Sequence, residues 1–438
     1  MDHNLDMDIK LEILYGGDAT AERLRARSWE TNSDAERTVS EIIADVRIKG
    51  DAAVREYTRR FDGVEPESFI VPESEIDEAS ARVHAEKPDL IDTFNRAADN
   101  IRAYHTKQVR QGFIATGERD GVLAGQRILP LDRVGLYIPG GTAAYPSTVF
   151  MNVIPARIAG VGEVYMASPP QRDGKCDPAI LTAARLAGVD GVFKMGGAQA
   201  IAAFAFGTES VPRVDKVTGP GNIYVATAKR QLYGIVDIEM IAGPSEILII
   251  ADAGADARYV AADMLSQAEH DALAAALLLT TDAGLAAAVA REIPLQLATL
   301  PRRDIAAQSL RGHGRIAVVA SLAQAAELSN QIAPEHLELC VRDPFALLGL
   351  IKHAGSVFLG DYTPEALGDY FAGPNHTLPT NGAARFASPL SVDDFTKKSS
   401  YTYYSKEALH KDMAHVARFA RQERFEAHAR SAEIRFID

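Results

Sequence analysis

Two short motifs bring metal-binding and proton-transfer side chains together in the sequence. Gln267 and His270 stand three residues apart in DMLSQAEHD, so a helix there would present an amide oxygen and an imidazole on one face. Glu335 and His336 are neighbours in APEHL, where Pro334 stiffens a turn before an apolar run. A carboxylate and an imidazole at such a turn suit general base catalysis. A polar helix end and a chance pair fit the same residues, so both interpretations stay open.

More carboxylates and imidazoles occur toward the carboxyl end. The tripeptide Gly-Asp-Tyr occurs twice, with Asp361 and Asp369, and His376 follows in AGPNHTLPT. Local spacing does not decide between the two aspartates. Glu423 and His428 stand in RQERFEAHAR, where a solvated helix face is the better explanation from the local sequence alone. Ligand chemistry is therefore available here, but no local pattern fixes the role of each residue.

Glycine-rich turns follow several apolar runs, and glycine lets backbone approach a ligand closely. These turns are residues 139–142, 196–199, 219–222 and 243–245. Tyr137, Gln199 and Asn222 add polar groups there. Because ligands of open α/β sheets bind beyond the carboxyl ends of the strands, we expect the four turns on one sheet edge. The GxGxxG fingerprint is absent, and its nearest match, 312–317, precedes a strand. If a nicotinamide cofactor binds, it therefore does so in a non-standard way.

Composition limits the kinds of protein this chain can be. With 438 residues, 47% apolar and 24% charged, it has the balance of a packed soluble protein of several domains. The net charge of −13 argues against a nucleic-acid or anionic-membrane partner. Only two cysteines occur, so a metal must be held by nitrogen and oxygen, and a reducing compartment is indicated. Without a signal-peptide pattern or a long apolar run, we expect a cytoplasmic protein.

The periodicity of apolar residues predicts an α/β protein. Residues 33–108 have the three-and-four spacing of helices. From residue 133 short apolar strands alternate with helices, and a second such series begins near residue 246, which predicts two α/β domains joined near 236–245. After residue 383 the sheet signal fades. The charged, amphipathic tail, residues 405–435, is expected to form helices that dock on another surface, such as a partner subunit.

These segments together resemble the histidinol dehydrogenase family from about residue 34 to the end. The resemblance rests on VGLYIPGGTAAYPSTVF, GGAQAIAAFAFGT, GPGNIYVATAKRQLYG, AGPSEILIIAD, SQAEHD, APEHLEL, GDYFAGPNHTLPT and FEAHA. It implies a zinc- and NAD-dependent enzyme that oxidises L-histidinol through L-histidinal to L-histidine, ending L-histidine biosynthesis.

The resemblance also assigns roles at the matching positions. It implies four zinc ligands, and it selects the second Gly-Asp-Tyr: Gln267, His270, Asp369 and His428. The implied general bases are Glu335 and His336. Ser245 and Glu423 would join the ligands and bases around the substrate. The implied NAD contacts are Tyr137, Gln199 and Asn222.

The implied architecture is two Rossmann-like, incomplete doubly wound α/β domains with a helical N-terminal segment and a small helical tail domain. The expected boundaries are an N-terminal segment 1–30, a first domain of 31–136 plus 245–390 with the zinc and catalytic residues, a second domain 137–244 with the NAD-binding turns, and a tail 391–438. The resemblance further implies a homodimer with one zinc per subunit. In it the tail residues Glu423 and His428 complete the site of the other subunit.

Three other functions are compatible with parts of the sequence. A dehydrogenase of the same family could act on another small polar alcohol. A metal-dependent hydrolase could use Glu335 to activate water and would need no nicotinamide. A non-catalytic binding protein would keep the ligand pockets but would have no need for Glu335 and His336.

Overall fold

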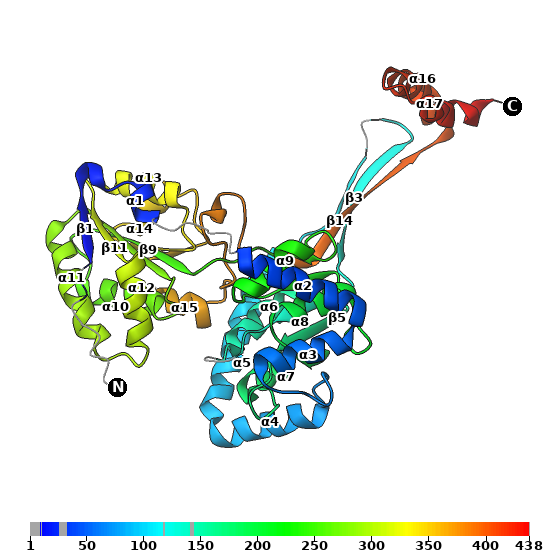
Figure 1. Cartoon of the computed structure of the whole chain (residues 1–438). Coiled ribbons are helices and arrows are strands. Elements are labelled where there is room, and N and C mark those ends of the chain that lie inside the picture. The colour runs from blue at the N-terminus through cyan, green and yellow to red at the C-terminus, as the bar shows by residue number, and fades with distance from the viewer. Residues whose placement is uncertain (1–8, 10, 26–32, 117–118, 141–143, 438) are drawn as a thin grey trace.

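The computed structural model describes residues 9, 11–25, 33–116, 119–140 and 144–437, which form two parallel sheets and a projecting arm (Figure 1). The five-stranded sheet has the order β6-β5-β4-β7-β8. Its strands are β4 Arg133–Tyr137, β5 Glu163–Ser168, β6 Gly191–Lys194, β7 Lys216–Thr218 and β8 Asp237–Ile238. Within this sheet the first strand is β4, and β5 and β6 are added in turn on one side of it. The next strands, β7 and β8, are added on the other side of β4, so the strand order reverses between β4 and β7.

The six-stranded sheet has the order β1-β11-β10-β9-β12-β13, again all parallel. Its strands are β1 Glu12–Tyr15, β9 Glu246–Ala251, β10 Ala275–Thr280, β11 Arg315–Val318, β12 His336–Cys340 and β13 Ser356–Leu359. Every residue of β9, β10 and β12 is buried, as expected for strands covered on both faces. The α/β series expected from periodicity is confirmed by both sheets.

Helices cover both faces of each sheet. On the five-stranded sheet, α4 Glu73–Glu86, α5 Pro88–His105, α6 Pro146–Ala159 and α7 Pro178–Ala187 share one core, and α2 Ser33–Lys49, α3 Asp51–Asp62, α8 Gly197–Phe206 and α9 Ile223–Leu232 share the other. On the six-stranded sheet, one core holds α10 Ala257–Ala268, α11 Ala283–Leu297 and α12 Arg303–His313, and the other holds α1 Ala21–Arg25, α13 Leu322–Ile332 and α14 Pro344–Leu348.

The packing corrects two parts of the expected domain grouping. The predicted helices of 33–108 are present, but they pack on the five-stranded sheet, not with residues 245–390, because their apolar faces meet the cores around Leu136 and Phe204. Within the segment 1–30, strand β1 pairs with β11 and so belongs to the six-stranded sheet. Residues 1–8, 10 and 26–30 of that segment lie outside the described residues.

A long arm carries the tail away from both sheets (Figure 1). It is an antiparallel ribbon of β2 Phe113–Ala115, β3 Val122–Pro130 and β14 Thr396–Tyr404, with helices α16 Lys406–Gln422 and α17 Glu426–Glu433 at its end. The helical tail is therefore confirmed. Although the sheet signal fades after residue 383, TKKSSYTYY forms a strand. It is polar and largely exposed, so it lacks the buried apolar run by which the parallel strands were predicted.

Candidate active site

The Pro-Glu-His motif forms a strained turn between α13 and β12. Ala333 ends α13 with φ 53°, a conformation that costs a non-glycine residue energy. Pro334 follows, and Glu335 and His336 are both buried where β12 begins. The helix-to-strand junction expected from the sequence is confirmed, and it fixes both side chains at the amino end of a central strand.

Hydrogen bonds orient the two side chains toward each other. The Nδ1 atom of His336 lies 3.1 Å from the carbonyl oxygen of Glu246, so Nδ1–H donates and Nε2 is left as the acceptor. That Nε2 atom is buried, has no hydrogen-bond partner among the described residues, and lies 3.8 Å from Asp369 Oδ1. Glu335 accepts a hydrogen bond from the Glu246 amide at 2.9 Å and lies 3.6 Å from His336 Nδ1. Nε2 is thus the imidazole nitrogen that can gain or lose a proton.

A cluster of metal-ligating side chains lies beside His336. Donor atoms of His270, Glu365 and Asp369 all fall within 4.8 Å of one another. Helix α15 Glu365–Tyr370 places Glu365 and Asp369 one turn apart on the same face. Gln267 is fully buried in the last turn of α10, and neither atom of its amide has a hydrogen-bond partner among the described residues. His270 lies just beyond the helix end, where its amide bonds to the Gln267 carbonyl, so the turn continues.

Burial and the neighbouring charges shift the proton affinities of this cluster. Burial raises the pKa of Glu335 to about 7 and that of Glu365 to about 7. Burial alone would lower the pKa of His336, but the carboxylates of Glu335, Glu365 and Asp369 outweigh it and raise that pKa well above 6.5. The pKa of Asp369 is lowered, since the facing imidazoles outweigh the opposite effect of its burial. Such opposed shifts are typical of catalytic sites.

The site lies between the two sheets. At the end of the turn 243–245, the carbonyl of Ser245 accepts a hydrogen bond from Ala275 while the Gly243 amide donates to Thr380 at 2.6 Å. His376 bonds the Asp369 carbonyl at 2.9 Å through Nδ1 and lies 3.3 Å from Thr148 on α6 through Nε2. These contacts fasten the acidic cluster to the five-stranded side.

The residues expected to bind a nicotinamide cofactor gather at the strand-order reversal of the five-stranded sheet. Tyr137 ends β4, and its hydroxyl accepts a hydrogen bond from the Gly197 amide at 3.1 Å. Gln199 is 1% exposed, and neither amide atom has a hydrogen-bond partner among the described residues. Gly219 has φ 114°, and a Cβ there would collide with the Tyr137 carbonyl, so only glycine allows this close approach. Ligands bind at such a switch point in open sheets.

A buried ion pair supports the next turn, 219–222. Lys229 Nζ lies 2.7 Å from the Glu239 carboxylate and 3.1 Å from the Gly219 carbonyl, while Glu239 accepts the Gly219 amide at 2.8 Å. Asn222 follows as the N-cap of α9, and its side-chain oxygen accepts the amides of Tyr224 and Val225. The side chain of Asn222 therefore has a capping role in addition to the expected ligand contact.

We expected the four glycine-rich turns to share one sheet edge, but they do not. The turns after β4, β6 and β7 lie at the carboxyl edge of the five-stranded sheet, although residues 141–143 are outside the described part of the chain. The turn 243–245 instead precedes β9, at the amino edge of the six-stranded sheet, where His336 also lies. This turn belongs to the connection that leads from the five-stranded sheet into the six-stranded sheet. It therefore lies where a strand begins and not where a strand ends.

Two predicted residues lie apart from the cluster within this single chain. Glu423 ends α16 and His428 lies in α17, both at the far end of the arm (Figure 1). The His428 ring lies 5.1 Å from that of Phe425. Conversely, the sequence did not single out Glu365, whose only signal is its spacing of four from Asp369. Asp361, in the first Gly-Asp-Tyr, is exposed, whereas Asp369 is buried.

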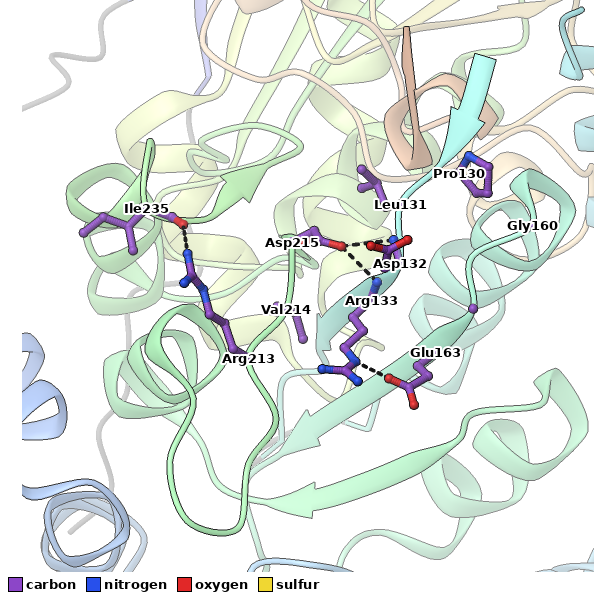
Figure 2. Close-up of a pocket in the computed structure, with 11 residues that line it drawn as sticks. Pro130, Leu131, Asp132, Arg133, Gly160, Glu163, Arg213, Val214, Asp215 and Ile235 are labelled. Carbon is purple, nitrogen blue, oxygen red and sulfur yellow. Dashed lines mark hydrogen bonds and ion pairs between the residues drawn. The ribbon is translucent and has the colours of Figure 1, made fainter. Parts of the chain in front are cut away.

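A separate pocket of about 840 Å³ lies at the opposite, amino edge of the five-stranded sheet, near the base of the arm (Figure 2). Four of the five charged side chains that line it have a partner. Arg133 binds Glu163, and Asp215 accepts the amides of Asp132 and Arg133 at 3.0 Å. Arg213 donates to the Ile235 carbonyl at 3.3 Å. The residues that line it include no histidine, and no group of metal-ligating side chains among the described residues falls there, so this pocket lacks the chemistry of the cluster between the sheets.

Comparison with known proteins identifies the relatives of the chain. The histidinol dehydrogenase family model matches residues 25–436. A histidinol dehydrogenase of Bacillus cereus is 52% identical over 430 residues, covering 98% of this chain and 99% of that protein. One from Geobacter metallireducens is 53% identical over 413 residues and covers 94% of each chain. The crystal structure of histidinol dehydrogenase from Elizabethkingia anophelis superposes with a TM-score of 0.91 at 37% identity, covering 97% of this chain and 98% of that one.

Proposed function

The chain belongs to the histidinol dehydrogenase family and is an oxidoreductase, and from that premise we propose that it oxidises L-histidinol to L-histidine with zinc and NAD. The observation that carries the proposal is the buried acceptor nitrogen of His336 beside the ligand cluster of His270 and Asp369. The hydrolase and the binding protein compatible with single motifs are set aside, because the family is one of dehydrogenases. No helix of the described residues is long and apolar enough to cross a bilayer.

The donor set of the cluster fits zinc. An imidazole, carboxylates and an amide oxygen are nitrogen and oxygen ligands, in keeping with the two cysteines, which are buried and free. The unpartnered amide of Gln267 is the kind of buried polar group that a metal would satisfy. We propose Gln267, His270, Asp369 and His428 as the ligands. Zinc, when bound, would hold and orient the imidazole and amine of the substrate.

The turns at the strand-order reversal fit NAD. Tyr137 and Gln199 offer a hydroxyl and an unsatisfied amide, and Asn222 begins α9, whose N-terminal amides favour phosphate oxygens. Backbone amides can hold the pyrophosphate although the chain carries a net charge of −13. NAD, when bound, would accept the hydride. Tyr137, Gln199 and Asn222 would hold NAD at this switch point, and the hydride would come from a substrate bound beside His336.

In the first oxidation, His336 Nε2 takes the proton of the substrate hydroxyl while the carbon gives up a hydride. The fixed hydrogen bond from Nδ1 to the Glu246 carbonyl keeps Nε2 as the acceptor. Three nearby carboxylates favour the protonated ring. Cationic charge held at Asp369 would offset part of this effect and bring the pKa of His336 back toward neutrality, where an imidazole accepts and returns protons.

The second oxidation begins with water. Glu335, with its pKa raised to about 7 by burial, is basic enough at neutral pH to take a proton from water as it adds to the aldehyde carbon. Protonated His336 returns its proton to the aldehyde oxygen as water adds, so that the hydrate forms and the imidazole is neutral again. The hydrate then gives a proton to His336 and its carbon gives a second hydride to a second NAD, which yields the carboxylic acid. Two hydrides leave per substrate, so two NADH form for each L-histidine. Ser245 and Glu423 are proposed to hold the substrate during both steps.

We propose that the chain works as a homodimer in the cytoplasm, with the tail of each subunit completing the site of the other. The arm carries Glu423 and His428 away from the cluster of their own chain (Figure 1). The tail also exposes large apolar side chains: Phe419, Phe425 and Ile434 are 71%, 52% and 64% exposed. Exposed apolar side chains of this kind are expected where a partner surface covers them.

The experiment is an assay of the purified protein with L-histidinol and NAD at 340 nm, the absorption band of NADH. We expect two NADH per L-histidine and loss of activity after chelation, restored by zinc. Asp369→Asn is expected to lose zinc, whereas the matched control Asp361→Asn keeps it. One NADH per turnover or no turnover refutes the proposal, and faster oxidation of another polar alcohol in a panel would assign that substrate instead.

A further inference from the structure

We propose that Glu365 is a fourth metal ligand within the chain itself, which holds zinc with Gln267, His270 and Asp369 while His428 of the partner subunit is not in place. The inference rests on the proposed function, because it adds a ligand to the proposed zinc site. It concerns how a single chain holds the ion before the shared site is complete.

The position of Glu365 carries the inference. Its carboxylate lies within 4.8 Å of donor atoms of both His270 and Asp369, whereas His428 lies on the arm. Glu365 is 2% exposed, and one of its oxygens accepts a hydrogen bond from the Ser266 hydroxyl at 3.2 Å. Ser266 precedes Gln267, so this bond ties the carboxylate to the helix that supplies the amide ligand. Orientation of a ligand by such a second contact is common at metal sites.

Charge gives a second, independent argument. Glu365 and Asp369 are both buried on one helix face, a spacing at which like charges destabilise a helix. Among the described residues no lysine or arginine forms an ion pair with either of them, and His336 Nε2 faces Asp369 without a hydrogen-bond partner. Two carboxylates match the charge of one divalent cation, so an ion bound here would remove most of the cost of burying them.

The ligand count also matters. The proposed ligands Gln267, His270 and Asp369 would number three, whereas closed zinc sites use four. Glu365 brings the number within the chain to four, with two negative charges. The imidazole of the partner subunit's His428 would then replace Glu365 when the tail arrives.

The test measures zinc affinity and not turnover. Purified His428→Ala, Glu365→Gln and the double variant are titrated with zinc against a chromophoric chelator, and the zinc content is confirmed by elemental analysis. Glu338→Gln, alone and with His428→Ala, is the matched control: Glu338 is 1% exposed and bonds the Glu365 amide at 2.7 Å, but it lies outside the ligand cluster. Circular dichroism and size-exclusion chromatography check that each variant folds.

We expect His428→Ala to keep about one zinc per chain and the double variant with Glu365→Gln to bind it at least about tenfold more weakly. The visible spectrum of cobalt-substituted His428→Ala should also change when Glu365 is replaced. If the double variant binds zinc as tightly as His428→Ala, or if Glu338→Gln weakens binding equally, the inference is overturned. A wild-type protein that binds no zinc would instead overturn the proposed function.

Discussion

The buried pair of Lys229 and Glu239 should control the stability of the five-stranded sheet and of its turn 219–222. The two side chains are 3% and 1% exposed, so Lys229→Met leaves a carboxylate buried without its cation and removes the donor to the Gly219 carbonyl. Loss of one partner of a buried pair costs about 3–5 kcal/mol. At about 2–4 °C per kcal/mol for a domain of this size, the midpoint of thermal unfolding should fall by about 6–20 °C.

Calorimetry and circular dichroism measure this shift, and a double variant tests its cause. Lys229→Met with Glu239→Gln has no buried charge, while the new amide oxygen can still accept the Gly219 amide, so it should be more stable than Lys229→Met alone by about 2 kcal/mol or more. The control is Lys49→Met, which breaks an exposed pair with Asp45 and should leave the midpoint almost unchanged. If Lys229→Met melts like Lys49→Met, or the double variant recovers nothing, the reasoning is wrong.

Three further predictions concern pH, the cofactor and the shared site. Burial raises the pKa of Asp62 from 3.8 to about 6, so between about pH 4 and pH 6 the folded chain keeps a proton that the unfolded chain has lost, and the free energy of unfolding falls as pH rises. Asp62→Asn should therefore gain stability over wild type across that range. An equal difference between the two proteins at pH 4 and pH 8 would contradict this. Tyr137→Phe leaves the Gly197 amide without its acceptor, so we expect the KM for NAD to rise about tenfold with little change in kcat, and a KM within twofold of wild type would speak against the contact. His336→Ala and His428→Ala chains, inactive by themselves, should regain about a quarter of wild-type activity when they are reassembled together. Half of the dimers are then mixed, and each mixed dimer has one complete site out of two. A mixture that forms heterodimers but stays inactive would exclude sharing of the tail.

Local sequence patterns predicted most helices and buried strands, because these elements depend on residues that are neighbours along the chain. The buried runs EILIIA and AALLLT predicted parallel strands, and Pro334 marked the junction that presents Glu335 and His336. Strand β14 was missed, since its alternation is polar and its only support is pairing with β3, more than 260 residues earlier. Glu365 was also missed, because the local sequence around a buried metal-ligating glutamate in a helix looks the same as that around an exposed one.

The sequence by itself determined the chemistry that is available: nitrogen and oxygen ligands without thiolates, an imidazole next to a carboxylate, and glycine turns for a cofactor. The family resemblance, confirmed by the comparisons, chose Asp369 over Asp361. Only the tertiary structure decided which helices cover which sheet. It also decided that the cluster beside the amino end of β12 is linked through His376 to Thr148 on α6, a helix of the other sheet. Burial and charge depend on residues brought together from distant segments, so the raised pKa of Glu335 and the position of Glu365 beside His270 could come from the fold alone.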